Sequence, residues 1–192
     1  MHFTKTPIEG AYLIELDPRP DDRGYFARTM CMNELAEYGL NANFVQQSIS
    51  WNPLAGTLRG MHFQASPHLE DKLVRVTRGA CFDVFFDMRP DSPSYGESHG
   101  QVLSADNHLS FYIPKGCAHG YQILEPDTEV FYQMTEEYQP GGARGIAWDD
   151  PDVGIDWPMT FDPEDRRQLS EADANQPSWA ELRQTLVISS VP

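Results

Sequence analysis

The chain has 192 residues, of which 40% are hydrophobic, and carries a formal net charge of −15. This length suits one domain with a sizeable core, and the composition indicates a globular protein and not a disordered one. The charge argues against a nucleic-acid partner, because binding a duplex needs a basic face. Apolar runs are too short to span a membrane, and the N-terminus lacks the apolar stretch of a secretory signal, so we expect a cytoplasmic protein.

The three cysteines, Cys31, Cys81 and Cys117, are odd in number and show no CxxC spacing. We therefore expect neither a disulfide framework nor a zinc cluster. Residues 125–173 hold 14 Asp and Glu against three Arg and no Lys, a pattern that we interpret as a solvated acidic face. Against this background, a phosphate-bearing ligand would need a local group of Arg and Lys.

The first fifty residues predict strands and one short helix. Apolar and β-branched runs bounded by turn residues predict strands at Ala11–Asp17, Tyr25–Met30 and Phe44–Ser50. Asn33 is the expected N-cap of the helix, and Gly39 is expected to end it.

From there the pattern is strand after strand, which predicts a sandwich or a small barrel. Phe161–Ala174 reads as irregular, and the capping box Ser178–Glu181 predicts a C-terminal helix through about Val187. We interpret 1–192 as one domain, with N-terminal strands in 1–50, a barrel core in 51–138 and a C-terminal tail with a helix in 139–192. The expected barrel strands are Thr57–Gln64, Lys72–Arg78, Ala80–Met88, Gly100–Ser104, Leu109–Ile113, His119–Leu124 and Glu129–Thr135.

One predicted strand places a cation, a glycine and a histidine within four residues, from Arg59 through Gly60 to His62. An imidazole has an ordinary pKa of about 6.5, so a histidine on a rigid strand can act as a general base near neutral pH. The alternative is a core or surface histidine without a chemical role. Lys72 and Asp83 lie on successive strands and can pair if both point into the barrel; otherwise Lys72 is an exposed strand lysine.

A second motif, Pro114-x-Gly116-x-x-His119, has the spacing of the second cupin motif, in which the histidine binds a metal. A cupin metal site also needs a His-x-His pair and a Glu on an earlier strand, but Gly60 stands where the first of those histidines would be. Two imidazoles without a matched carboxylate make a poor zinc or iron site, so the sequence favours the barrel and argues against its metal.

Tyr132 and Asp173 each allow two interpretations. The phenol of Tyr132 could donate a proton, or it could be a packed strand aromatic with a satisfied hydroxyl. Asp173 could orient a histidine, or it could be one more residue of the acidic tail.

Together the motifs resemble one family, the dTDP-4-dehydrorhamnose 3,5-epimerases, which are nucleotide-sugar epimerases with a metal-free cupin jelly roll. The resemblance runs from about residue 5 to 175. It implies a mainly β fold, a cupin-type antiparallel jelly-roll barrel with a few short peripheral helices. The motifs that carry it are Asp22–Phe26, Thr57–Gln64, Lys72–Val76, Phe82–Val84, Ile113–Gly120, Trp148–Pro151 and Leu169–Asp173.

The resemblance also implies roles. His62 is the base that removes a proton next to the C4 ketone, Asp173 holds its imidazole, and Tyr132 returns a proton from the opposite face. Lys72, steadied by Asp83, stabilises the enolate oxygen. The family dimerises by exchanging N-terminal strands, so a homodimer is expected, with a nucleotide-diphosphate sugar as substrate and with no cofactor, metal, nucleic acid or membrane. The expected substrate contacts are Arg59 and His119 at the diphosphate, Arg23 from a partner subunit, and Phe26, Arg28, Gln47 and Tyr138.

Strict alternation would put Arg59 and His62 on opposite faces, so both can serve one site only if the strand is bulged, with Gly60 as the plausible place. The sequence departs from the common family pattern at three places: Arg28, the run Gln46–Ser50, and Glu70. Several substrates and activities therefore stay open. They are inversion at C3, at C5 or at both, a CDP-linked or other nucleotide sugar, a 3,4-ketoisomerase, a metal-dependent cupin, and a sugar-nucleotide-binding cupin without activity.

Overall fold

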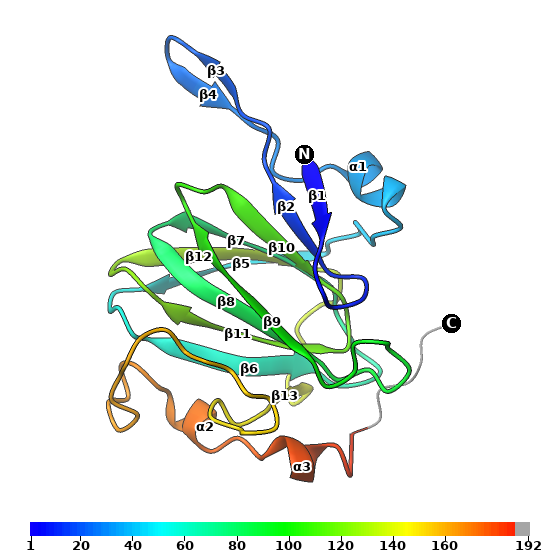
Figure 1. The fold of residues 1–192 in the computed structure, drawn as a ribbon, viewed down its shortest axis with the longest axis vertical. Coiled ribbons are helices and arrows are strands. Elements are labelled where there is room, and N and C mark those ends of the chain that lie inside the picture. The colour runs from blue at the N-terminus through cyan, green and yellow to red at the C-terminus, as the bar shows by residue number, and fades with distance from the viewer. Residues whose placement is uncertain (187–192) are drawn as a thin grey trace.

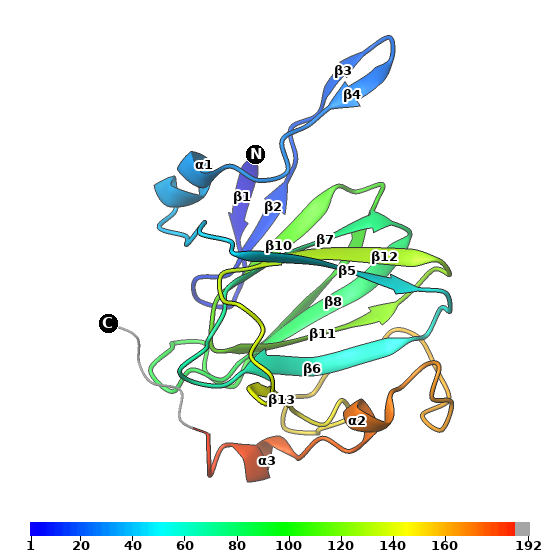
Figure 2. The same ribbon diagram turned by 180° about the vertical axis from the view of Figure 1, so that it is seen from behind.

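The computed structural model describes residues 1–186 and forms two antiparallel sheets that lie face to face (Figures 1 and 2). The six-stranded sheet has the order β1-β2-β10-β7-β12-β5, and the five-stranded sheet has the order β13-β6-β11-β8-β9. The strands of the first sheet are β1 (His2–Lys5), β2 (Tyr12–Glu15), β10 (Leu109–Ile113), β7 (Lys72–Arg78), β12 (Thr128–Met134) and β5 (Gln46–Asn52). Those of the second are β13 (Ala143–Gly145), β6 (Leu58–Gln64), β11 (Cys117–Ile123), β8 (Ala80–Asp87) and β9 (Ser98–Ser104).

Consecutive strands of the barrel region alternate between the two sheets, except that β8 and β9 form a hairpin within the five-stranded sheet. The chain passes from β5 to β6, from β6 to β7 and from β7 to β8, and each step changes sheet. This winding is that of the cupin-type jelly roll, so the predicted fold class is confirmed. No helix within residues 1–186 is long and apolar enough to cross a membrane.

The core lies between the sheets, and a second apolar layer lies outside the five-stranded sheet. Inward-facing residues of both sheets, including Val74, Phe85 and Phe111, are fully buried against one another. The outer layer joins strand residues such as Phe86 to Trp179 of the C-terminal segment, with the two rings 5.2 Å apart and nearly perpendicular. The C-terminal segment therefore closes the open face of this sheet, as Figure 1 shows.

Two short helices, α2 (Glu171–Ala174) and α3 (Trp179–Leu182), belong to this C-terminal segment. The predicted capping box is confirmed, because the Ser178 side chain accepts from the Glu181 backbone and the Glu181 side chain accepts from the Ser178 backbone. The helix ends at Leu182, earlier than predicted, and Val187 lies outside the described residues. The interpretation of 161–174 as irregular missed α2, a single turn with Ser170 as its N-cap.

The N-terminal region differs most from its prediction. The predicted strand Tyr25–Met30 is only β4 (Gly24–Phe26), which pairs with β3 (Arg19–Asp21) in a hairpin that projects from the barrel (Figure 1). The helix α1 (Met32–Glu37) begins after Cys31 and not after Asn33. The remaining barrel strands match their predictions within two residues at each end. Three short strands, β1, β3 and β13, were not predicted.

Candidate active site

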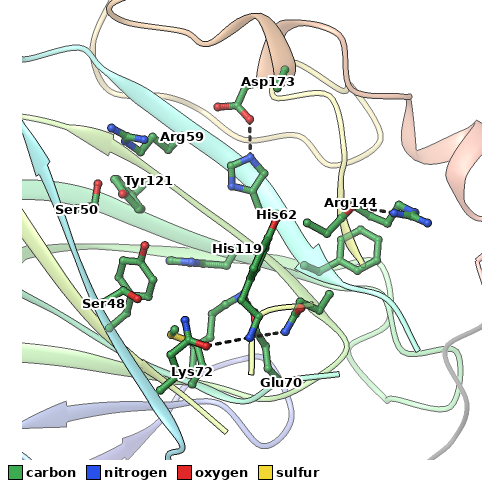
Figure 3. A pocket seen from close by; sticks show the side chains of 18 of the residues that line it. Ser48, Ser50, Arg59, His62, Glu70, Lys72, His119, Tyr121, Arg144 and Asp173 are labelled. Carbon is green, nitrogen blue, oxygen red and sulfur yellow. Dashed lines mark hydrogen bonds and ion pairs between the residues drawn. The ribbon is translucent and has the colours of Figure 1, made fainter. Parts of the chain in front are cut away.

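A cavity of about 640 Å³ opens between the two sheets. Its lining comes from β5 and β12 of one sheet, from β6 and β11 of the other, and from the start of β7, with α2 at the rim (Figure 3). Four of the five predicted catalytic residues and three of the seven predicted substrate contacts line it. The seven residues that do so are His62, Tyr132, Asp173, Lys72, Arg59, His119 and Tyr138.

A bulge in β6 brings Arg59 and His62 into the same cavity. Opposite β11, His62 faces His119 and Arg59 faces Tyr121, so three steps along β6 match two steps along β11. Gly60 lies in this extra-residue stretch with a φ of +133°, and a Cβ there would stand 2.5 Å from the Cα of Gly120. The predicted bulge is therefore confirmed, and only a residue without a side chain fits it.

His62 and Asp173 form a hydrogen-bonded pair across the rim of the cavity. The Nε2 of His62 lies 2.5 Å from Oδ1 of Asp173, and the histidine side chain is 47% exposed whereas the aspartate side chain is 7% exposed. The segment before α2 is tied to β6, because the backbone N–H of Leu58 donates to the carbonyl of Gln168. With its Nε2–H directed at the carboxylate, the imidazole keeps Nδ1 as the nitrogen that can accept a proton.

The predicted pair of Lys72 with Asp83 is wrong. The Nζ of Lys72 lies 3.0 Å from Oε1 of Glu70, and both side chains are 11% exposed. Asp83 instead accepts from Nε2 of His119 at 2.9 Å, and both residues are buried. The reason is topological: β7 and β8 follow one another in the sequence but belong to different sheets, so the two side chains do not become cross-strand neighbours.

The Asp83 carboxylate lies behind His119 and does not line the cavity. Its Oδ1 is buried without a hydrogen-bond partner among the described residues, so His119 is its one observed partner. This contact fixes the ring of His119 with its other edge available to the cavity. No three or more His, Cys, Asp or Glu side chains are grouped to hold a metal ion in the part of the chain that the structure describes.

Two tyrosines contribute phenols to the cavity. Burial raises the pKa of Tyr132; the positive charge of Arg59 opposes this effect, and the negative charge of Glu70 adds to it. Burial also raises the pKa of Tyr121. Both phenols therefore keep their protons at neutral pH and can act as hydrogen-bond or proton donors.

The other predicted substrate contacts do not line the cavity of this chain. Gln47 points to the outer face of β5, and alternation gives its place to Gln46. Arg23 and Phe26 lie on the projecting hairpin, where Phe26 is 74% exposed. Arg28 follows the hairpin and pairs with Glu34 at 2.7 Å.

Several cavity residues were not among the predicted site residues. Alternation from Gln46 would have found Ser48 and Ser50, which share its face of β5. The same spacing rule would have indicated Glu70, because it is two residues before Lys72 and so shares its face of the extended chain. Other cavity residues, among them Tyr121, Arg144 and Gln176, are indicated by no local sequence pattern. Their positions depend on how the strands and the C-terminal segment pack together.

The fold and the cavity together define a cupin-type enzyme whose site has paired acid–base side chains. The sequence profile of one family, dTDP-4-dehydrorhamnose 3,5-epimerase, matches residues 5–181. The chain belongs to this family, and it is therefore an isomerase.

Relatives and solved structures agree. The dTDP-4-dehydrorhamnose 3,5-epimerase of Methanothermobacter thermautotrophicus is 44% identical over 185 residues, which cover 96% of each chain. The crystal structure of the Elizabethkingia anophelis enzyme is similar with a TM-score of 0.87 and 35% identity, over 94% of this chain and 97% of that one. A Legionella pneumophila 3,5-epimerase in complex with dTDP-4-keto-L-rhamnose matches with a TM-score of 0.84 and 35% identity, over 92% of each chain.

Proposed function

We propose that this chain inverts C3 and C5 of a dTDP-linked 4-keto-6-deoxyglucose and so forms dTDP-4-keto-L-rhamnose. One observation carries the proposal: His62 comes from the five-stranded sheet, whereas Tyr132 and Lys72 come from the six-stranded sheet across the cavity. A sugar ring between the sheets would thus meet a base on one face and an acid on the other. The substrate is that suggested by the names of the relatives and by the ligand of the Legionella enzyme.

The reaction is a proton removal followed by a proton return. Hydrogens at C3 and C5 are weakly acidic because both carbons are next to the C4 ketone. His62 takes the proton through Nδ1, the C–H electron pair moves toward the ketone oxygen, and Asp173 stabilises the imidazolium. Tyr132 then gives its proton to the carbon from the other face, which inverts it. Exchange with solvent returns a proton to Tyr132 and removes one from His62.

The cations of the cavity supply the remaining functions. Lys72 stabilises the negative charge that develops on the C4 oxygen, since a fixed cation is worth most where charge appears in the transition state. Arg59 binds the diphosphate, because its Nε is held by Oδ1 of Asn52 at 2.8 Å, whereas its two terminal nitrogens have no partner among residues 1–186 and can bind phosphate oxygens. His119, fixed by Asp83, contributes a second contact to the diphosphate.

A homodimer with exchanged N-terminal strands would complete the site. Two observations on the N-terminal region support it: the hairpin β3–β4 projects from the barrel in Figures 1 and 2, and its Tyr25 and Phe26 are 55% and 74% exposed. The outer face of β5 also exposes Ile49 and Trp51, at 59% and 52%. Exposed apolar side chains on these two elements suit an interface. Arg23 and Phe26 would then reach the cavity of the partner.

We also propose a cytoplasmic location. The three cysteines are free, with Cys81 and Cys117 buried and Cys31 partly buried. Free thiols suit a reducing compartment. A periplasmic or secreted form of the chain in fractionated cells would contradict this part of the proposal.

The direct test of the function is hydrogen exchange in D2O. We expect deuterium at both C3 and C5 of dTDP-4-keto-6-deoxyglucose by NMR, and no exchange at either carbon with His62→Ala. Deuterium at one carbon would make the chain a mono-epimerase, and a product with its ketone moved to C3 would make it a ketoisomerase. Binding without exchange, for dTDP and CDP sugars alike, would leave only a sugar-nucleotide-binding protein and refute the proposal.

A further inference from the structure

One cation of the cavity differs from the others. The cavity is lined by three side chains that carry a positive charge at neutral pH, Arg59, Lys72 and Arg144. Among the residues that the structure describes, Lys72 is the only one of the three with an ion-pair partner, the carboxylate of Glu70 at 3.0 Å. Both partners are 11% exposed, so this pair lies in the wall of the cavity and not on the surface of the protein.

The Glu70 carboxylate is held on its other oxygen as well. Nε2 of Gln64 donates to Oε2 of Glu70 at 2.9 Å. The orientation of the Gln64 amide is set by the loop around Tyr138, because its Nε2 also donates to the carbonyl of Glu137 and its Oε1 accepts from the N–H of Gln139. Glu70 therefore has one fixed orientation, with Oε1 directed at Lys72.

The backbone beneath this pair is also anchored. Asp71, between the two residues, points to the opposite side and is buried. Its backbone N–H donates to Oγ1 of Thr135 at 2.8 Å, and its carboxylate accepts from the N–H of Lys115 at 3.0 Å. Alternation around this anchor leaves Glu70 and Lys72 side by side on the cavity face. Figure 3 shows them across His62 from Asp173.

We propose that Glu70 is a positioning residue that holds the Lys72 ammonium at the place where the substrate's C4 oxygen becomes negative. This inference rests on the proposed function, in which Lys72 stabilises the enolate. A lysine side chain has four rotatable bonds, so without a partner its ammonium would spend only part of its time next to the C4 oxygen. An ion pair with a fixed carboxylate keeps the ammonium at that position. The carboxylate also balances one positive charge in the resting cavity, so Lys72 is not left as an unpaired cation between substrates.

The tests compare two changes at this position with a matched control. Glu70→Ala removes the contact to Lys72, whereas Glu70→Gln keeps an oxygen acceptor. The amide of Glu70→Gln cannot satisfy both neighbours, because its NH2 group must face either Lys72 or Nε2 of Gln64, and both are donors. Glu136→Gln is the control, since Glu136 pairs with His68 at 3.1 Å and does not line the cavity.

We expect Glu70→Ala to lower kcat for C3 and C5 exchange about tenfold, and Glu70→Gln about threefold, with KM changed less than twofold. The loss falls on kcat because the C4 oxygen is an anion only in the transition state and the intermediate. The control should keep the wild-type values. Wild-type kcat in Glu70→Ala, or a loss confined to KM, would overturn the inference.

A pH profile separates positioning from a general structural defect. Tyr132 shares the cavity with Arg59, His62, Lys72, His119, Tyr121 and Asp173, and Glu70 adds negative charge near it. Removal of this charge in Glu70→Gln should move the alkaline limb of kcat to lower pH, because the phenol then loses its proton more easily. A structural defect would lower kcat equally at all pH values, and that result would overturn the inference.

A third measurement does not depend on activity. A held, hydrogen-bonded ammonium exchanges its protons slowly, so the wild-type protein should show a 1H–15N signal of Lys72 that Lys72→Arg lacks. This signal should be lost in Glu70→Ala and kept in Glu136→Gln. If the wild-type chain exchanges no sugar hydrogen, the proposed function fails, but the signal still decides whether Glu70 holds Lys72. Persistence of the signal in Glu70→Ala would refute the positioning role.

Discussion

Replacement of Gly60 by alanine tests the bulge that brings Arg59 and His62 into one cavity. The new Cβ would stand 2.5 Å from the Cα of Gly120 and 3.0 Å from the carbonyl oxygen of His119, and both atoms belong to backbone that cannot rotate away. Carbon atoms pack at about 3.5–4.0 Å, so β6 and β11 must separate by about 1 Å. Such overpacking costs about 1–3 kcal/mol, and the φ of +133° adds about 1–3 kcal/mol for a residue with a side chain.

Gly24→Ala is the matched control. Gly24 has nearly the same φ, +131°, but, its two chain neighbours aside, no atom of the described residues lies within 4 Å of the point that its Cβ would occupy. Gly24→Ala should therefore lose only the stability that the unfavourable φ costs. The difference in the free energy of unfolding between the two variants then measures the cost of the steric clash at Gly60.

The assay is urea unfolding followed by circular dichroism at one fixed protein concentration, because a dimer would make stability depend on concentration. We expect Gly60→Ala to lower the free energy of unfolding by about 2–6 kcal/mol and Gly24→Ala by about 1–3 kcal/mol. Gly60→Ala should also lower kcat, because Arg59 and His62 no longer share one geometry. The same free energy of unfolding for both variants, within about 0.5 kcal/mol, would refute the reasoning.

Three further changes test the acid–base groups and the N-terminal ion pairs. Tyr132→Phe should keep deuterium exchange but lower inversion about 10²–10⁴-fold, and it should remove an alkaline limb of kcat that lies above pH 10, since burial raises the pKa of Tyr132. Full inversion in this variant would assign the acid elsewhere. Asp173→Asn should lower kcat about 10²–10⁴-fold with KM nearly unchanged, because Asp173 acts through His62; steady-state kinetics would contradict this role if kcat fell less than threefold. Hydrogen bonds from the N-terminal amine and then from Arg28 lower the pKa of Glu34 to about 2, so its stabilising effect is present above its ordinary pKa of 4.5 and is lost as pH falls toward 2. Glu34→Gln should therefore make Tm depend less on pH between pH 4.5 and 2 than it does in the wild type or in a Glu37→Gln control. An unchanged pH dependence of Tm would show that the two pairs of Glu34 contribute nothing to stability.

Local patterns predicted those parts of the fold and site that depend on a few neighbouring residues. Strand alternation and turn residues located the barrel strands, and Ser178 with Glu181 located a helix start. The motif around His62 and the spacing before His119 were enough to indicate the barrel and to make His62 the candidate base. Four of the five predicted catalytic residues line one cavity, His62 and Asp173 among them, although 111 positions separate these two in the chain.

Local patterns could not predict which side chains from different strands contact one another. The sequence places Lys72 and Asp83 on adjacent strands, and the tempting inference is that they pair. Because the chain changes sheet between β7 and β8, Lys72 meets Glu70 and Asp83 meets His119. A similar error put Gln47 in the site in place of Gln46, since a shift of one residue moves a strand side chain to the other face.

Motif spacing and strand periodicity are local properties of the chain, so they were enough to predict the fold class and the family and to single out His62 as the candidate base. Which charged side chains pair with one another became clear from the three-dimensional arrangement of the strands. Contacts between sheets depend on strand order and register, and these are set by burial of the whole core and not by any one segment. The bulge at Gly60 depends on both kinds of information. The sequence shows the glycine, but the reason for it is the close backbone of Gly120, which lies on a strand sixty positions away.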